Sequence, residues 1–239
     1  MAEFRSKIFQ LNNIFVVEVF LFALIITGLI PREAALYLAA GLAVYAFLAP
    51  LEDAVVLFIR SIPFFLALPF TANFDNFNTW RILAALIFLK WFATKFSIKS
   101  QFSNFKISNF KLPLVLLTVF AVLSVIPAGD KVLAVKRVIY FLNLSLIGFV
   151  IYDLAHTSSF ARRLIKNISI PVIIVTVVGL IQLISTYFID IYQFMRIWGE
   201  GIQCRQFGKQ WCSIVVELGN TWFAYYGEQL SLRVFSLFP

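Results

Sequence analysis

The fold class is indicated by the residues Ile168–Phe188, which read ISIPVIIVTVVGLIQLISTYF. This segment holds no charged residue over 21 positions, about the length that an α-helix needs to cross the hydrocarbon core of a membrane. The whole chain has the same character: 61% of its 239 residues are hydrophobic and 13% are charged, with a mean hydropathy of +0.90. A soluble domain carries about 25% charged residues. The composition therefore predicts an all-α, polytopic membrane protein, and it excludes a disordered chain, a nucleic-acid-binding module and a secreted disulfide scaffold.

Six further apolar segments of similar length precede these residues, which gives about seven predicted spans. The seven are Asn13–Ile30, Glu33–Ala49, Ala54–Phe70, Thr79–Thr94, Leu112–Ala128, Val132–Tyr152 and Ile168–Phe188. The third is irregular because it contains Arg60, Pro63 and Pro69. Proline interrupts the hydrogen bonds of a helix, so this segment is expected to be kinked, broken or re-entrant.

The distribution of basic residues predicts the orientation of these spans. With the N-terminus inside, the segments on the cytoplasmic side carry nine Lys or Arg residues and the short outer loops carry three. Because Lys and Arg accumulate in cytoplasmic loops, the N-terminus is expected to lie inside. We expect residues 1–188 to form a membrane bundle. Residues 189–239 are then expected to be an extracytoplasmic segment that leads into a C-terminal membrane domain outside this sequence.

Acidic residues and histidine give few candidates for chemistry. Glu18, Glu33 and Asp153 are the acids in or beside the predicted spans, and all three are expected near an interface, where water or a polar group can reach them. This argues against a proton-coupled carrier. His156, the single histidine, is expected in a solvated loop. No cluster of His, Cys and acidic residues predicts a metal site, and no cofactor is expected.

The basic residues within the spans are more informative. Arg60 is expected about 15 Å below the outer end of its helix, and Arg81 at the outer start of the fourth span. Lys136 and Arg137 lie just inside the outer end of the sixth span. Together they predict an outward-opening basic cavity that suits a pyrophosphate, because guanidinium groups bind phosphate in a bidentate manner. The alternative is that each side chain reaches the interface or pairs within the protein.

Two cysteines, Cys204 and Cys212, lie eight residues apart in the predicted outer segment. An extracytoplasmic position would allow them to form a loop disulfide. Two reduced and unrelated thiols are the alternative.

Two segments resemble the bacterial O-antigen ligase and O-antigen polymerase family. One is Asp75–Leu83 (DNFNTWRIL), an outer loop that runs into a helix with an arginine at its start. The other is Leu232–Pro239 (LRVFSLFP), in which an arginine and an aromatic residue precede a Phe-Pro pair. The order of hydropathy along the chain, several closely spaced spans followed by a longer outer segment, is also similar to that of the family.

The resemblance implies a multi-pass protein of the bacterial inner membrane that transfers a glycan from an undecaprenyl-pyrophosphate carrier to an acceptor at the outer face. It also implies catalysis without a metal, with arginines that hold the pyrophosphate and a later outer-loop histidine that activates the acceptor. Arg233 is the first candidate for a pyrophosphate-binding arginine, followed by Arg81 and Arg60. The partners implied are the lipid-linked glycan and the bilayer, and no nucleic acid.

The chain departs from the family because no predicted outer loop contains a histidine. We therefore expect it to be the N-terminal part of a ligase-like or polymerase-like glycosyltransferase, catalytically incompetent by itself. Two alternatives from other classes stay open. One is a transporter or flippase subunit for a lipid-linked or anionic substrate, and the other is a non-catalytic membrane subunit.

Overall fold

The fold is that of a helical protein. The computed structural model describes residues 10–71, 77–97, 111–208, 212, 223–226 and 229–232. Of these described residues, 81% are helical. The longer helices are α2 (Leu11–Thr27), α3 (Ala34–Leu48), α4 (Leu51–Ser61), α5 (Thr79–Ser97), α6 (Lys111–Leu123), α7 (Lys131–Leu154) and α8 (Ser158–Ser185). The predicted all-α class is therefore confirmed, whereas the number of spans and the position of the N-terminus stay predictions.

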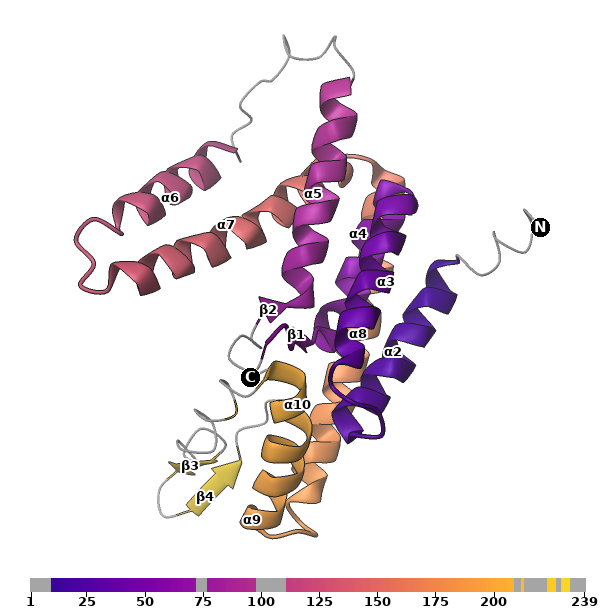
Figure 1. The fold of residues 1–239 in the computed structure, drawn as a ribbon, viewed down its shortest axis with the longest axis vertical. Coiled ribbons are helices and arrows are strands. Elements are labelled where there is room, and N and C mark those ends of the chain that lie inside the picture. The colour runs from indigo at the N-terminus through magenta and orange to yellow at the C-terminus, as the bar shows by residue number, and fades with distance from the viewer. Residues whose placement is uncertain are drawn as a thin grey trace.

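The core of the bundle forms around α4, which packs against α2, α3, α5 and α8 (Figure 1). All residues from Ala54 to Ile59 are buried, so the middle of α4 is apolar on every side, as expected where a helix has neighbours all round. On α2, Phe15 and Phe22 meet Phe64 edge to face, with ring centroids 5.7 and 5.2 Å apart. These aromatic contacts join α2 to the segment that follows α4.

The third predicted span is a broken helix. The α-helix α4 ends at Ser61, and one 3₁₀ turn, η1 (Ile62–Phe64), follows it. The chain then becomes extended as β1 (Ala67–Leu68), which pairs antiparallel with β2 (Phe77–Asn78). Pro63 lies in the 3₁₀ turn and cannot donate the hydrogen bond that would continue the α-helix. The break was one of the three outcomes expected from the prolines, and α4 is only 11 residues long as a result.

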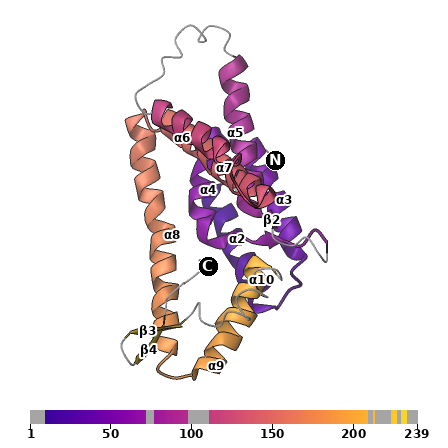
Figure 2. The same cartoon turned by 90° about the vertical axis from the view of Figure 1, so that its left-hand side faces the viewer.

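The seventh predicted span begins earlier than expected. Helix α8 starts at Ser158 rather than at Ile168 and continues to Ser185 along one side of the molecule (Figure 2). The basic stretch Arg162–Lys166, which we predicted to lie in a loop, is therefore helical, and this part of α8 packs against α4. The prediction placed the helix start too late because it followed hydrophobicity alone.

A hairpin of α6 and α7 projects sideways from the bundle and joins it through the contact between α5 and α7 (Figure 1). Asp130 caps α7, because its side chain accepts a hydrogen bond of 2.9 Å from the amide of Leu133. Where the hairpin meets the bundle, Asp153 accepts a hydrogen bond from Trp91 and forms an ion pair of 3.0 Å with Lys95. These contacts hold the end of α7 against α5.

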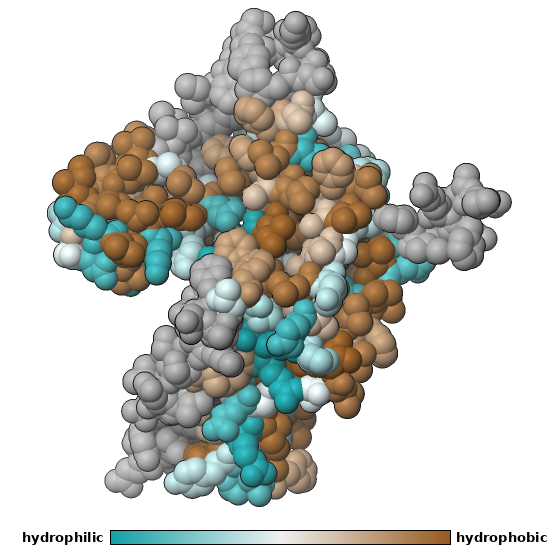
Figure 3. Space-filling view, in the orientation of Figure 1, coloured by the Kyte–Doolittle hydropathy of each residue, from teal (hydrophilic) through white to brown (hydrophobic). Residues whose placement is uncertain are grey.

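The surface is consistent with a membrane protein. Of the described helices, α7 and α8 are long and apolar enough to cross a membrane. Large apolar side chains are exposed along α6, α7 and α8, and also on α2 and α3, and brown hydrophobic patches cover much of the face seen in Figure 3. Apolar surface of this extent favours contact with lipid or with other membrane helices.

A helical segment after α8 turns back along the bundle (Figure 2). It consists of α9 (Ile191–Phe194), the π-helix η3 (Met195–Gln203) and α10 (Cys204–Phe207), and it packs against α2 and β1. Asp190 caps its start. Strands β3 (Phe223–Tyr226) and β4 (Gln229–Leu232) pair antiparallel further on. Part of the predicted outer segment is thus a helix that packs on the bundle.

Candidate functional site

The candidate site is built around Arg81, in the first turn of α5. The start of this helix is fixed because Thr79 donates two hydrogen bonds of 3.0 Å to the carbonyl of Leu66, one from its amide and one from its hydroxyl. The guanidinium of Arg81 then lies against three rings. Its central carbon is 5.4 Å from the centroid of Phe77, 5.7 Å from Trp80 and 4.1 Å from Tyr140. Cation–π contacts of this kind orient the charge without neutralising it.

Helix α7 supplies the other half of the site. Lys136, Tyr140 and Asn143 follow each other at intervals of four and three residues, so they share one face of the helix. Tyr140 contacts Arg81, which shows that this face meets the start of α5. Within the described residues, Nε of Arg81 and Oδ1 of Asn143 are buried and have no hydrogen-bond partner. A cation and a polar stripe therefore meet at the contact between α5 and α7.

Arg137 lies on a neighbouring face of α7. It lines a cavity of about 430 Å³ between α6 and α7, together with Ser124, Asp130 and Phe141. Lys136 is not part of the lining of this cavity. Sequence reasoning placed Lys136 and Arg137 in one cavity, whereas the helical spacing of one residue turns them toward different sides.

Arg60 does not join this site. Its Nε donates a hydrogen bond of 2.6 Å to Oδ1 of Asn167 on α8, and its Nη1 donates one of 2.7 Å to Oδ1 of Asn12 on α2. The guanidinium also lies 5.5 Å from the ring centroid of Phe15. Arg60 thus contacts residues of α2 and α8, whereas Arg81 contacts rings of β2, α5 and α7, so these contacts do not bring the two arginines together. Asn12 marks the start of α2, so Arg60 faces the end of the bundle that we predict to be cytoplasmic.

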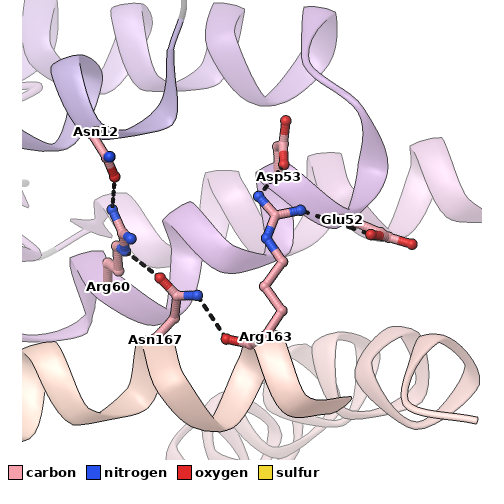
Figure 4. A network of polar contacts seen from close by, with 6 residues as sticks. All are labelled: Asn12, Glu52, Asp53, Arg60, Arg163 and Asn167. Atoms are coloured by element: carbon pink, nitrogen blue, oxygen red, sulfur yellow. Dashed lines mark hydrogen bonds and ion pairs between the residues drawn. The ribbon is translucent and has the colours of Figure 1, made fainter. Parts of the chain in front are cut away.

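Arg60 is part of a polar network between α2, α4 and α8 (Figure 4). Asn167 donates a hydrogen bond of 2.6 Å from Nδ2 to the carbonyl of Arg163, one turn earlier on α8. Arg163 in turn forms ion pairs with Asp53 and Glu52 in the first turn of α4. The alternative reading of Arg60, a cation that pairs within the protein, therefore agrees with its observed contacts.

Glu18 is more buried than its position in the sequence indicated. Only 1% of it is exposed, and Ser61 donates a hydrogen bond of 2.6 Å to its Oε2. Its Oε1 has no hydrogen-bond partner in the described part of the chain. The expected polar partner is thus present, but water does not reach the carboxylate, because Ser61 and Phe64, which packs on Phe15 and Phe22, lie on this face of α2. The shallow position of Glu18 therefore no longer argues against a proton-coupled carrier.

The predicted outer segment contributes structural contacts. Cys204 and Cys212 are joined by a disulfide with their Cα atoms 4.8 Å apart. Arg32 donates hydrogen bonds of 3.1 Å to the carbonyls of Arg205 and Ala67, so it ties α10 to β1. Arg233, the first candidate from the family resemblance, lies outside the described residues.

His156 is exposed, and its Nδ1 lies 2.8 Å from the carbonyl of Tyr152, one turn earlier at the end of α7. It has the surroundings expected of a loop histidine near the protein surface. No group of three or more His, Cys, Asp or Glu residues in the described ranges could hold a metal ion.

The sequence analysis did not identify the polar residues beside the two arginines. These are Tyr140 and Asn143 near Arg81, and Asn12 and Asn167 in the network around Arg60. Asparagine within an apolar helix is a usable signal, because an amide that enters a bundle needs a hydrogen-bond partner. The identity of the partner depends on tertiary contacts and cannot be read from spacing. Comparison with known proteins adds no further residue: no protein-family model, curated protein or solved structure matches this chain.

Proposed function

We propose that the chain is the N-terminal membrane part of a glycosyltransferase of the O-antigen ligase or polymerase kind. In this proposal it crosses the bacterial inner membrane several times, with its N-terminus inside. The site formed by Arg81, Lys136 and Asn143 binds the pyrophosphate of an undecaprenyl-linked glycan at the outer face. The transfer itself requires a base that this sequence does not offer in an outer loop.

The observation that carries the proposal is the environment of Arg81. Three aromatic rings hold its guanidinium, and within the described residues Nε is buried without an acceptor. A phosphate oxygen would supply that acceptor and the countercharge. Lys136 is exposed one turn before Tyr140 on the same face, where it can add a second cation. The rings and the exposed apolar surface of α7 would contact the isoprenyl chain.

A transporter or flippase subunit is the second candidate, and a different observation favours it. Helix α4 is interrupted beside the buried pair of Glu18 and Ser61. Discontinuous helices and buried acids are typical of ion-coupled carriers. In this case, binding of an isoprenyl pyrophosphate would depend on the gradient or the concentration of a coupling ion, whereas a glycosyltransferase site requires none.

The affinities of three ligands that share one isoprenyl chain but differ in phosphate content test the proposal. The 239-residue chain in lipid nanodiscs should bind farnesyl pyrophosphate most tightly, farnesyl monophosphate more weakly and farnesol weakest. We expect about a tenfold or larger difference in dissociation constant between the pyrophosphate and the alcohol, because charge-assisted hydrogen bonds to the phosphate are lost. Microscale thermophoresis measures all three constants. Equal affinity for the three compounds would show that only the apolar tail is recognised.

A further inference from the structure

A second cleft lies at the opposite end of the bundle, where α2 begins. Its volume is about 470 Å³, and it is lined by Gln10, Leu11, Asn12, Asp53, Arg60, Arg163 and Asn167. Six of these seven side chains are polar. Pockets for drug-sized organic ligands are mostly apolar, so this cleft suits a small and strongly polar group. It is independent of the site around Arg81, which lies on other helices.

The two arginines of the cleft differ in how their charge is balanced. Arg163 is paired with the carboxylates of Asp53 and Glu52. Arg60 instead donates to two amide oxygens, those of Asn12 and Asn167 (Figure 4). An amide oxygen orients a guanidinium but carries no formal charge to neutralise it. Within the described residues, Arg60 therefore has an oriented positive charge without a carboxylate partner, beside open volume.

The network also keeps Arg60 in place. Its Nε and Nη1 groups are used by Asn167 and Asn12, and a guanidinium has five N–H donors. Three donors are thus without a hydrogen bond to any residue that the structure describes. Asn167 is held in turn by its bond to the carbonyl of Arg163. A preorganised guanidinium of this kind binds an oxyanion at low cost in conformational entropy.

The charge around the cleft favours an anion. Arg162 and Lys166 are exposed on the same stretch of α8. Among the residues that the structure describes, the surroundings therefore hold four cations, including Arg60 and Arg163, and two carboxylates that both pair with Arg163. In the predicted orientation this end of the bundle meets the cytoplasmic leaflet, which carries anionic lipids.

We propose that this cleft binds the phosphate of an anionic phospholipid headgroup of the cytoplasmic leaflet, with Arg60 as the main contact. The side chains of Asn12 and Asn167 position the guanidinium. The proposal depends on the predicted orientation of the chain but not on the glycosyltransferase function, because Arg81 and Lys136 take no part in it.

The test measures binding of short-chain phosphatidylglycerol to the full chain in detergent micelles, by native mass spectrometry. Phosphatidylcholine, which has no net charge, and inorganic phosphate serve as comparison ligands. We expect phosphatidylglycerol to bind at least about tenfold more tightly than either, since it offers both an uncompensated phosphate and an acyl chain. Equal binding of phosphatidylcholine, or displacement of the lipid by an equal concentration of inorganic phosphate, would overturn the assignment to an anionic lipid.

The replacement Asn12→Asp locates the site. It keeps an oxygen acceptor for Arg60 but adds a carboxylate that neutralises the guanidinium, so affinity for phosphatidylglycerol should fall about tenfold while the helical circular dichroism is unchanged. Asn13→Asp places the same charge on the next, exposed residue and should change affinity less than about threefold. Arg60→Gln should lose as much affinity as Asn12→Asp. Unchanged affinity in Asn12→Asp, or an equal loss in Asn13→Asp, would contradict the role of Arg60.

Discussion

Replacing Arg81 by alanine should weaken binding of farnesyl pyrophosphate to the chain by about ten- to a hundredfold. The substitution removes a charge-assisted contact worth about 1.5–3 kcal/mol. Arg81→Lys should recover only part of this affinity, because an ammonium group keeps the charge but neither forks around a phosphate nor stacks between Phe77, Trp80 and Tyr140. The dissociation constants in nanodiscs give the comparison directly.

Arg162→Ala is the matched control for this experiment. Arg162 is an exposed arginine on α8, next to Arg163, which pairs with carboxylates of α4, so its replacement removes the same charge from another surface. Its effect on affinity should stay below about threefold, as expected for a screened surface charge. An equal loss in both variants would indicate attraction by net charge alone, and full affinity in Arg81→Ala would contradict the proposed site.

Replacing Phe22 by alanine should give the largest loss of stability among single substitutions in α2. Phe22 is 3% exposed and meets Phe64 edge to face. The substitution leaves a cavity between α2 and η1, and such cavities cost about 3–5 kcal/mol in well-packed cores. Because packing and not water exclusion drives helix association in a bilayer, the lower end of this range is expected. Unfolding by sodium dodecyl sulfate in mixed micelles measures the free energy.

Phe20→Ala provides the comparison for this prediction. Phe20 lies two residues earlier on the same helix and is 63% exposed, so its ring contacts the surroundings of the protein and leaves no internal cavity when removed. Its loss should change the free energy of unfolding by no more than about 0.5 kcal/mol. If the two variants are destabilised equally, α2 does not pack as described.

The sequence was sufficient to place helices whose ends coincide with the ends of apolar stretches. The predicted span Val132–Tyr152 corresponds closely to α7, and Asn13–Ile30 overlaps most of α2. Hydrophobicity did not predict the start of α8, because its first turns contain the charged residue Arg163. The carboxylate partners of Arg163 on α4 compensate this charge, so a polar helical turn is stable there. The long-range pairing that permits this is invisible in a hydropathy profile.

In the candidate sites too, the sequence predicted local features but not the contacts between helices. Arg81 was recognised because an arginine at the start of an apolar helix is conspicuous, and its position in the first turn agrees with that expectation. Its relation to Tyr140 could not be predicted, because it depends on how the α6–α7 hairpin docks on α5. Arg60 was assigned to the same cavity from its depth along the span. The structure turns its side chain toward Asn12 at the other end of the bundle, a direction that depth alone does not specify.

Photo-crosslinking is the decisive test of the proposed pyrophosphate site, because it reports where a bound pyrophosphate lies on the chain. The probe is an isoprenyl pyrophosphate with a diazirine next to the pyrophosphate, added to the 239-residue chain in nanodiscs and located by peptide mass spectrometry. The proposed site predicts labelled peptides that contain Phe77–Arg81 and Lys136–Asn143, with labelling abolished by excess farnesyl pyrophosphate. Labelling confined to peptides that contain Asn12, Arg60 or Asn167 would place the pyrophosphate in the cleft at the opposite end and rule out a site at Arg81.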